Sequence, residues 1–132
     1  MALSTRLVVL SGIFLAGCAV KFDPVEHARI VDIHFNIQQA ISTNQCSYPV
    51  SMAETARTIA RDADWLALYV QHVPNNQSLQ TMSTEFAKGS QDLAARYEPS
   101  KPPPSKIFCE LRLKNLNTQI EVIQRTNARR PR

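Results

Sequence analysis

The chain has 132 residues, of which 15 are Lys or Arg and 11 are Asp or Glu, so its formal net charge is +4. This length allows one domain with a modest core and is too short for two domains of ordinary size. The slight basic excess gives no reason to expect nucleic acid as a partner. Only three glycines are present, and two of them, Gly12 and Gly17, lie near the N-terminus. So few glycines provide few sites for tight hairpin turns, which favours helices over sheets.

The N-terminus has the organisation of an export signal. Arg6 supplies a positive charge, and residues 7–15 form an apolar stretch that contains Ser11 and Gly12. This stretch has roughly half of the ~20 residues that a membrane-spanning helix needs, so it is typical of the apolar part of a signal peptide. It ends in two small residues and a cysteine, within the sequence Leu15-Ala16-Gly17-Cys18.

These four residues resemble the lipobox of bacterial lipoproteins. The resemblance implies that residues 1–17 are a signal peptide, that cleavage falls between Gly17 and Cys18, and that Cys18 is lipidated. Two or three acyl chains on one residue anchor a protein far more firmly than one chain does. In this family an aspartate directly after the cysteine favours the inner membrane. Because Ala19 stands there, the resemblance implies the periplasmic face of the outer membrane. An ordinary secretory signal beside an unrelated cysteine is the alternative.

The two remaining cysteines, Cys46 and Cys109, form an even pair. In an oxidising periplasm such a pair predicts a disulfide, and two free buried thiols are the alternative. A metal site is disfavoured because neither cysteine belongs to a CxxC motif or lies near a histidine. His27 and His34 are seven residues apart, which is too wide for one ion on a single helix. We therefore expect neither a metal nor a cofactor.

The first of four predicted helical segments begins at Asp23, which can cap a helix. Pro24 suits the first turn, and Glu26 can complete a capping box with Asp23. Apolar residues then recur at helical spacing to about Thr43, at Ile30, Ile33, Ile37 and Ala40 or Ile41. A half-buried strand is the alternative, because polar residues alternate with Val31, Ile33, Phe35 and Ile37. The unbroken length and the start signal favour a helix.

The second segment begins with another predicted capping box, Ser51-Met52-Ala53-Glu54, and is ended by Pro74-Asn75-Asn76. Its apolar row comprises Met52, Ala56, Ile59, Ala63, Leu66, Val70 and Val73. Small side chains let a partner helix approach closely, and a neighbouring row of alanines therefore predicts a tight helix–helix seam. These alanines are Ala53, Ala56, Ala60, Ala63 and Ala67.

The third segment has one apolar stripe, which Gly89-Ser90 is expected to interrupt or bend. The stripe consists of Leu79, Met82, Phe86, Leu93 and Tyr97. A stiff, proline-rich connector over residues 99–104 leads to the fourth segment. The fourth segment has apolar residues at alternating spacings of four and three, at Cys109, Leu113, Leu116, Ile120 and Ile123, and is expected to fray from Asn127 onwards.

We predict an all-α fold, an antiparallel up-down-up-down four-helix bundle cross-linked by one disulfide. A lipidated linker over residues 18–22 precedes the bundle of residues 23–128, and a basic tail over residues 129–132 follows it. On this path the end of the first helix meets the start of the fourth, as a Cys46–Cys109 disulfide requires. Cys18 and the basic tail then lie together at the opposite, membrane-proximal end.

Two groups of residues are candidates for interactions. Trp65 and Tyr69 are four residues apart, and residues of these types dominate the hot spots of protein interfaces. They are a possible partner-binding site, with packing at the edge of the core as the alternative. Three arginines in the tail are candidates for contact with anionic head groups, with a solvated tail as the alternative. They are Arg129, Arg130 and Arg132.

The mature sequence as a whole is similar to the small lipoproteins of tailed bacteriophages. The resemblance rests on residues 17–26, Cys46, the segment 105–109 and the C-terminal sequence Arg130-Pro131-Arg132. The resemblance implies the biological context in which the protein acts but no mechanism. Some phage lipoproteins block a receptor or a murein step against a second phage, whereas others are outer-membrane spanins that link the two membranes during lysis.

No sequence motif indicates catalysis: a nucleophile elbow, a phosphate-binding loop, an HExxH motif and a dinucleotide fingerprint are all missing from the sequence. We therefore expect no catalytic residues and predict a non-enzymatic module that binds an envelope protein, with superinfection exclusion or interference with a receptor or murein step as its role. A spanin-like lysis protein is the alternative, and an envelope enzyme is a third possibility.

Overall fold

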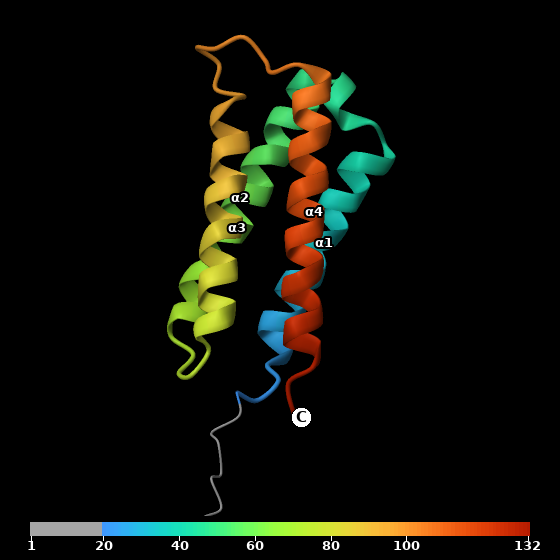
Figure 1. Ribbon diagram of the computed structural model, residues 1–132. Helices are drawn as coiled ribbons and strands as arrows, with labels where there is room; N and C mark the ends of the chain where they lie inside the picture. The colour runs from blue at the N-terminus through green and yellow to red at the C-terminus, as the bar shows by residue number, and fades with distance from the viewer. Residues whose placement is uncertain (1–19) are drawn as a thin grey trace, which may run out of the picture.

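A computed structural model describes residues 20–132, and over this range the protein is all-helical. Four α-helices are present with one short 3-10 helix, and Figure 1 shows that they run alternately up and down. Each α-helix packs closely against two others, and no Cα atoms of the diagonal pairs lie within 8 Å of each other, as in a square bundle. The predicted four-helix bundle is therefore confirmed. The helices are α1 (Pro24–Ser42), η1 (Gln45–Ser47), α2 (Pro49–Gln71), α3 (Gln77–Ala95) and α4 (Lys106–Ala128).

Helix α1 begins where the sequence predicts. The Asp23 carboxylate accepts hydrogen bonds from the backbone N–H groups of Val25 and Glu26, and Pro24 occupies the first turn. The strand alternative is wrong, because residues that would share one strand face are divided between core and surface. Ile33 and Ile37 are completely buried, whereas Val31 and Phe35 are exposed.

Helix α2 begins two residues earlier than the predicted capping box. Pro49 is the first helical residue and has the fixed φ that suits this position, so the helix is already under way at Ser51. The capping-box prediction for Ser51 and Glu54 is therefore wrong. The alanine row is confirmed as a close-packing surface, since Ala56, Ala60, Ala63 and Ala67 are buried and α2 packs most extensively against α3.

The turn between α2 and α3 is held by a side chain from the next helix. Asn75 adopts a left-handed conformation with φ of 59°, which reverses the chain. Gln80 then donates hydrogen bonds from its amide to the carbonyl oxygens of Val70, at 3.3 Å, and Val73, at 3.2 Å. The Val73 carbonyl lies beyond the end of α2, whereas the Val70 carbonyl also accepts a hydrogen bond from the Val73 N–H at 3.1 Å.

Helix α3 is continuous through Gly89 and Ser90, so the predicted interruption is wrong. The Ser90 hydroxyl donates to the Phe86 carbonyl at 2.8 Å, which satisfies this buried polar group within the helix. Gly89 faces α4, and a Cβ atom placed there would lie 3.4 Å from the Leu116 side chain. Ser105 caps α4 by accepting a hydrogen bond from the Phe108 N–H, and α4 continues to Ala128.

The predicted disulfide is confirmed between Cys46 in η1 and Cys109 in the first turn of α4, with the two Cα atoms 5.7 Å apart. It lies at the end of the bundle opposite to residues 20–23 and the C-terminus (Figure 1). The predicted signal peptide and the predicted lipidation site, Cys18, lie outside the described residues. Among residues 20–132, no helix is long and apolar enough to cross a membrane.

Reduction of the disulfide should lower the free energy of unfolding by about 4 kcal/mol, because the bond restricts the number of conformations that the unfolded chain can adopt. The bonded residues are 63 positions apart in the sequence. Urea unfolding followed by circular dichroism, with and without reductant, measures the change. The double variant Cys46→Ser/Cys109→Ser is the control and should not respond to reductant. Equal unfolding midpoints for the oxidised and reduced protein would contradict this prediction.

Candidate functional site

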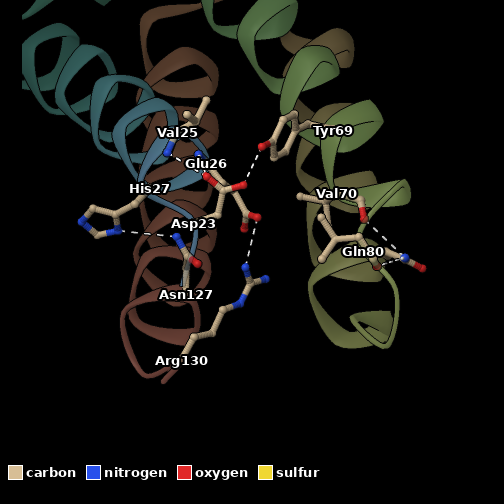
Figure 2. A network of polar contacts seen from close by, with 10 residues as sticks. Asp23, Val25, Glu26, His27, Tyr69, Val70, Gln80, Asn127 and Arg130 are labelled. Atoms are coloured by element: carbon tan, nitrogen blue, oxygen red, sulfur yellow. Dashed lines mark hydrogen bonds and ion pairs between the residues drawn. The ribbon is translucent and has the colours of Figure 1, made fainter. Parts of the chain in front are cut away.

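A network of polar side chains closes the end of the bundle at which the described chain begins and ends. Figure 2 shows Asp23 and Glu26 from the start of α1, Tyr69 from α2, and Asn127 and Arg130 from the end of α4 and just beyond it. The carboxylate of Asp23 points towards Tyr69, and that of Glu26 points towards Arg130. The network therefore joins three of the four helices.

At the centre of this network is a buried ion pair between Glu26 and Arg130. Nη1 of Arg130 lies 3.0 Å from Oε2 of Glu26, and the side chains are 7% and 0% exposed. Burial raises the pKa of the Glu26 carboxyl because the charged form loses its hydration, and the Arg130 guanidinium opposes this shift. The carboxylate of Glu26 is thus engaged across the bundle, and the prediction that it completes a capping box with Asp23 is wrong.

Asp23 is shifted in the opposite direction. One carboxylate oxygen caps α1, and the other accepts a hydrogen bond of 2.5 Å from the Tyr69 hydroxyl. The Tyr69 hydrogen bond is the main cause that lowers the pKa of Asp23, and burial partly opposes it. The same hydrogen bond raises the pKa of Tyr69. Two carboxylates three residues apart therefore have pKa values shifted in opposite directions by their surroundings.

The residues before α1 and after α4 also contact each other. The Phe22 N–H donates to the Pro131 carbonyl at 2.9 Å, and the Arg132 guanidinium carbon lies 5.3 Å from the centre of the Phe22 ring. The sequence predicts a linker at Phe22 and a tail at residues 130–132, but these contacts make both segments part of the folded end. Arg130 is buried with Glu26 and is not available to a head group, whereas Arg129 is exposed.

Several buried atoms of this network have no hydrogen-bond partner within residues 20–132. They include Oε1 of Glu26, Nη2 of Arg130 and Oδ1 of Asn127. Each such atom loses hydration without full compensation, so the ion pair contributes less to stability than its geometry suggests. What the pair does provide is specificity, since any arrangement that separates Glu26 from Arg130 leaves a buried charge without a partner.

The predicted partner-binding residues are engaged within the molecule. Trp65 and Tyr69 are stacked with their ring centres 4.8 Å apart, and the Arg29 guanidinium carbon lies 4.9 Å from the centre of the Trp65 ring. Arg29 also contacts Asp62 at 3.8 Å. These contacts connect α1 with α2, and Tyr69 belongs to the polar network. Binding of a partner by this pair stays a prediction.

The histidines do not assemble with other ligands. His34 shares a hydrogen bond of 2.6 Å with Gln124, and His27 lies 3.5 Å from the Asn127 amide nitrogen. Over the part of the chain that the structure describes, no group of three His, Cys, Asp or Glu side chains is placed to hold a metal ion.

The opposite end of the bundle exposes large apolar side chains around the disulfide. Val50 is 88% exposed and Ile107 is 70% exposed, and Tyr48 and Leu111 are also exposed. Each of the four lies within four residues of Cys46 or Cys109 in the sequence, so all are confined to this end. We call these four residues the distal apolar cluster. Sequence reasoning missed it, although Ile107 and Leu111 are four residues apart and lie outside the buried row of α4.

Comparison with protein-family models, with curated proteins and with solved structures finds no match for this chain. Its function is therefore inferred from its own residues and their geometry.

Replacing Arg130 with Gln should lower the free energy of unfolding by about 3–5 kcal/mol near neutral pH, because ionised Glu26 stays buried without its cation. The pKa of Glu26, already raised above its usual 4.5, should rise further. A raised pKa penalises the folded state above that pKa, and the penalty disappears as the pH falls below the value in the unfolded chain. The deficit relative to the wild type should therefore shrink on acidification.

Denaturant unfolding of both proteins at several pH values between neutral and about 4.5 measures this deficit. The matched control is Arg129→Gln, which removes the exposed neighbouring guanidinium and should change the free energy of unfolding by less than about 0.5 kcal/mol. A deficit of Arg130→Gln that is the same at every pH would show that Glu26 is not the group left unpaired.

Replacing Tyr69 with Phe removes the hydrogen bond that holds the pKa of Asp23 low. The lowered pKa stabilises the fold above the unfolded value of 3.8, and this contribution is lost as the pH falls through the pKa of the folded state. We expect a loss of about 1 kcal/mol near neutral pH that vanishes in acid. An NMR titration should show the pKa of Asp23 rising in this variant, and an unchanged pKa would contradict the assignment. Tyr97→Phe is the control and should leave the titration of Asp23 unaltered.

Proposed function

We propose that this chain is a non-enzymatic lipoprotein, anchored through Cys18 to the periplasmic face of the outer membrane, that binds an envelope protein through the distal apolar cluster. The observation that carries the proposal is the difference between the two ends of the bundle. At one end the chain arrives from Cys18, and buried polar contacts close the fold. At the other end large apolar side chains face the solvent.

The short distance along the chain from Cys18 to the bundle supports this orientation. Cys18 precedes Asp23 by five residues, which span at most about 17 Å when fully extended. Lipidation of Cys18 would therefore hold the polar end of the bundle close to the bilayer. Helix α4 has 23 residues and is about 35 Å long. The distal apolar cluster would then stand about one helix length further out, where a protein partner can reach it.

The chemistry of this cluster supports a protein partner. Exposed apolar side chains that gather at one place are typical of interaction sites, whereas single exposed ones are ordinary. The resemblance to phage lipoproteins suggests a host envelope protein whose engagement blocks a receptor or murein step. The compact bundle fits this role better than the spanin alternative, since a link between two membranes needs a long reach. Here successive helices fold back on one another, so the bundle is only about 35 Å long.

The proposal is tested by following both location and binding in cells. The wild-type protein should sediment with outer membranes, and Cys18→Ser should be released into the soluble fraction, because it lacks the acyl chains that supply the membrane affinity. A photo-crosslinking residue placed at Val50 or at Ile107 should give one discrete adduct with an envelope protein. Val50→Asp should abolish the adduct formed from position 107 without changing the free energy of unfolding by more than about 0.5 kcal/mol.

The matched control is a crosslinking residue at Phe35, which is also a large exposed apolar residue but lies within α1 rather than beside the disulfide. It should not give the adduct. The same adduct from Phe35, or no adduct from either distal position at native expression, would count against binding through the distal end. A Cys18→Ser protein that still sediments with membranes would count against the lipid anchor.

A further inference from the structure

Near the distal end, two arginines from different helices converge on one aromatic ring. The guanidinium carbon of Arg96, at the end of α3, lies 5.2 Å from the centre of the Phe108 ring, and that of Arg112, in α4, lies 5.3 Å from it. Phe108 is half-buried and packs on the core, so it holds both contacts in a defined place. Two positive charges are thereby gathered at one point between α3 and α4.

These two arginines are left without acidic partners, whereas their neighbours are paired. Lys101 pairs with Glu98 at 3.1 Å, and Lys106 pairs with Glu110 at 3.7 Å. Within residues 20–132, neither Arg96 nor Arg112 forms an ion pair. Both guanidiniums therefore retain donors that match a carboxylate in a two-bond arrangement.

The surface continues along α4 as two parallel rows. One row begins with the Phe108 ring and Arg112, and the same helical spacing of four and three adds two polar residues, Asn115 and Gln119. Beside it lies a hollow of about 240 Å³ between α3 and α4, which opens where Gly89 has no side chain. Arg112, Asn115 and Gln119 line this hollow, and amide side chains can both donate to and accept from a peptide backbone.

The neighbouring row of α4 begins with two exposed apolar residues, Ile107 and Leu111, which belong to the distal apolar cluster. The same spacing then places Lys114 and Thr118 before Val122, so the apolar part of this row is confined to the distal end. The two guanidiniums at Phe108 and the exposed apolar residues beside them match a ligand that has the complementary arrangement. Such a ligand has carboxylates on one face and aliphatic side chains on the next, as an acidic amphipathic helix does.

We infer that this α3–α4 surface binds an acidic amphipathic segment of the partner protein, with carboxylates on Arg96 and Arg112 and aliphatic side chains on Ile107 and Leu111. The inference rests on the proposed function, because it names the chemistry of the partner bound at the distal end. Arginine is enriched at the energetic centres of protein interfaces, and complementary charge sets the orientation of the partner. Arg96 and Arg112 lie towards the end opposite to residues 20–23, which is the end far from the bilayer in the proposed function, so a protein segment suits the surface better than a bilayer does.

The test uses the full chain in neutral detergent and a synthetic helical peptide with Glu at i and i+4 and Leu on the adjoining face. Its control is a scrambled peptide of the same composition. Isothermal titration calorimetry should show binding of the first peptide that is at least about tenfold tighter than that of the scrambled one. Arg96→Gln/Arg112→Gln should weaken binding by about tenfold or more, and Leu111→Ser by several-fold.

The matched control is Arg57→Gln/Arg61→Gln, which removes the same charge from two exposed positions of α2 and should change the affinity less than about twofold. The inference would be overturned if both double variants weakened peptide binding equally. It would also be overturned if the protein bound the scrambled peptide or duplex DNA as tightly as the first peptide. In each case non-specific attraction to a basic protein would explain the data. Absence of peptide binding would also overturn it.

These outcomes are separable from those of the proposed function. Discrete crosslinks from Val50 and Ile107 could persist in the Arg96→Gln/Arg112→Gln variant. This result would refute binding of an acidic segment but would still support a protein partner at the distal end. Peptide binding that the variants weaken as expected would support the inferred role of the α3–α4 surface. It would do so even if Cys18→Ser still sedimented with membranes and thus counted against the lipid anchor.

Discussion

The buried ion pair between Glu26 and Arg130 is the constraint on which one end of the bundle depends, the end where residues 20–23 and the C-terminal residues lie. It joins the first turn of α1 to Arg130, two residues after the end of α4, across 104 positions of the sequence. Once both charges are out of water, separating them is costly, and replacing them with apolar residues can be neutral or even favourable. The pair is therefore better understood as a device that selects one arrangement of the chain ends than as a large source of stability. The hydrogen bond from Phe22 to Pro131 and the contact of Arg132 with Phe22 join the same two segments of the chain.

A second constraint, the disulfide, acts on the same two helices from the other end. Cys46 follows α1 and Cys109 lies in the first turn of α4, so α1 and α4 are fixed to each other at both ends. Helices α2 and α3 form a hairpin with a close, alanine-rich seam and pack against this pair. The two ends of the bundle consequently lie at a fixed distance from each other and carry different types of side chain. Buried charge gathers near the entry of the chain, and exposed apolar and unpaired basic side chains gather near the disulfide.

The proposed function and the inferred acidic segment both follow from this polarity. In the proposed function, a lipid anchor on Cys18, five residues before Asp23, would leave the domain little freedom to turn over, so the distal end would be the one that meets other proteins. The surface found there combines the features expected of an interface. It has anchoring apolar side chains, guanidiniums with free donors, and a polar hollow in which amide groups can meet a peptide backbone.

Periodicity alone determined much of this protein. The stripe Ile30, Ile33, Ile37 and the stripe Cys109, Leu113, Leu116 predicted helices and their buried faces correctly, because local spacing decides which side chains share a face. The same stripes held a clue to the polar network, since Glu26 and Asn127 continue them by one turn and are buried. Local signals failed where a stronger neighbour overrode them, as Pro49 did for the start of α2. Only the tertiary structure decided the roles of the charged residues, by burying Arg130 with Glu26 and bringing Arg96 and Arg112 to one ring. Pairing between helices depends on their register in space, and no spacing within a single helix encodes it.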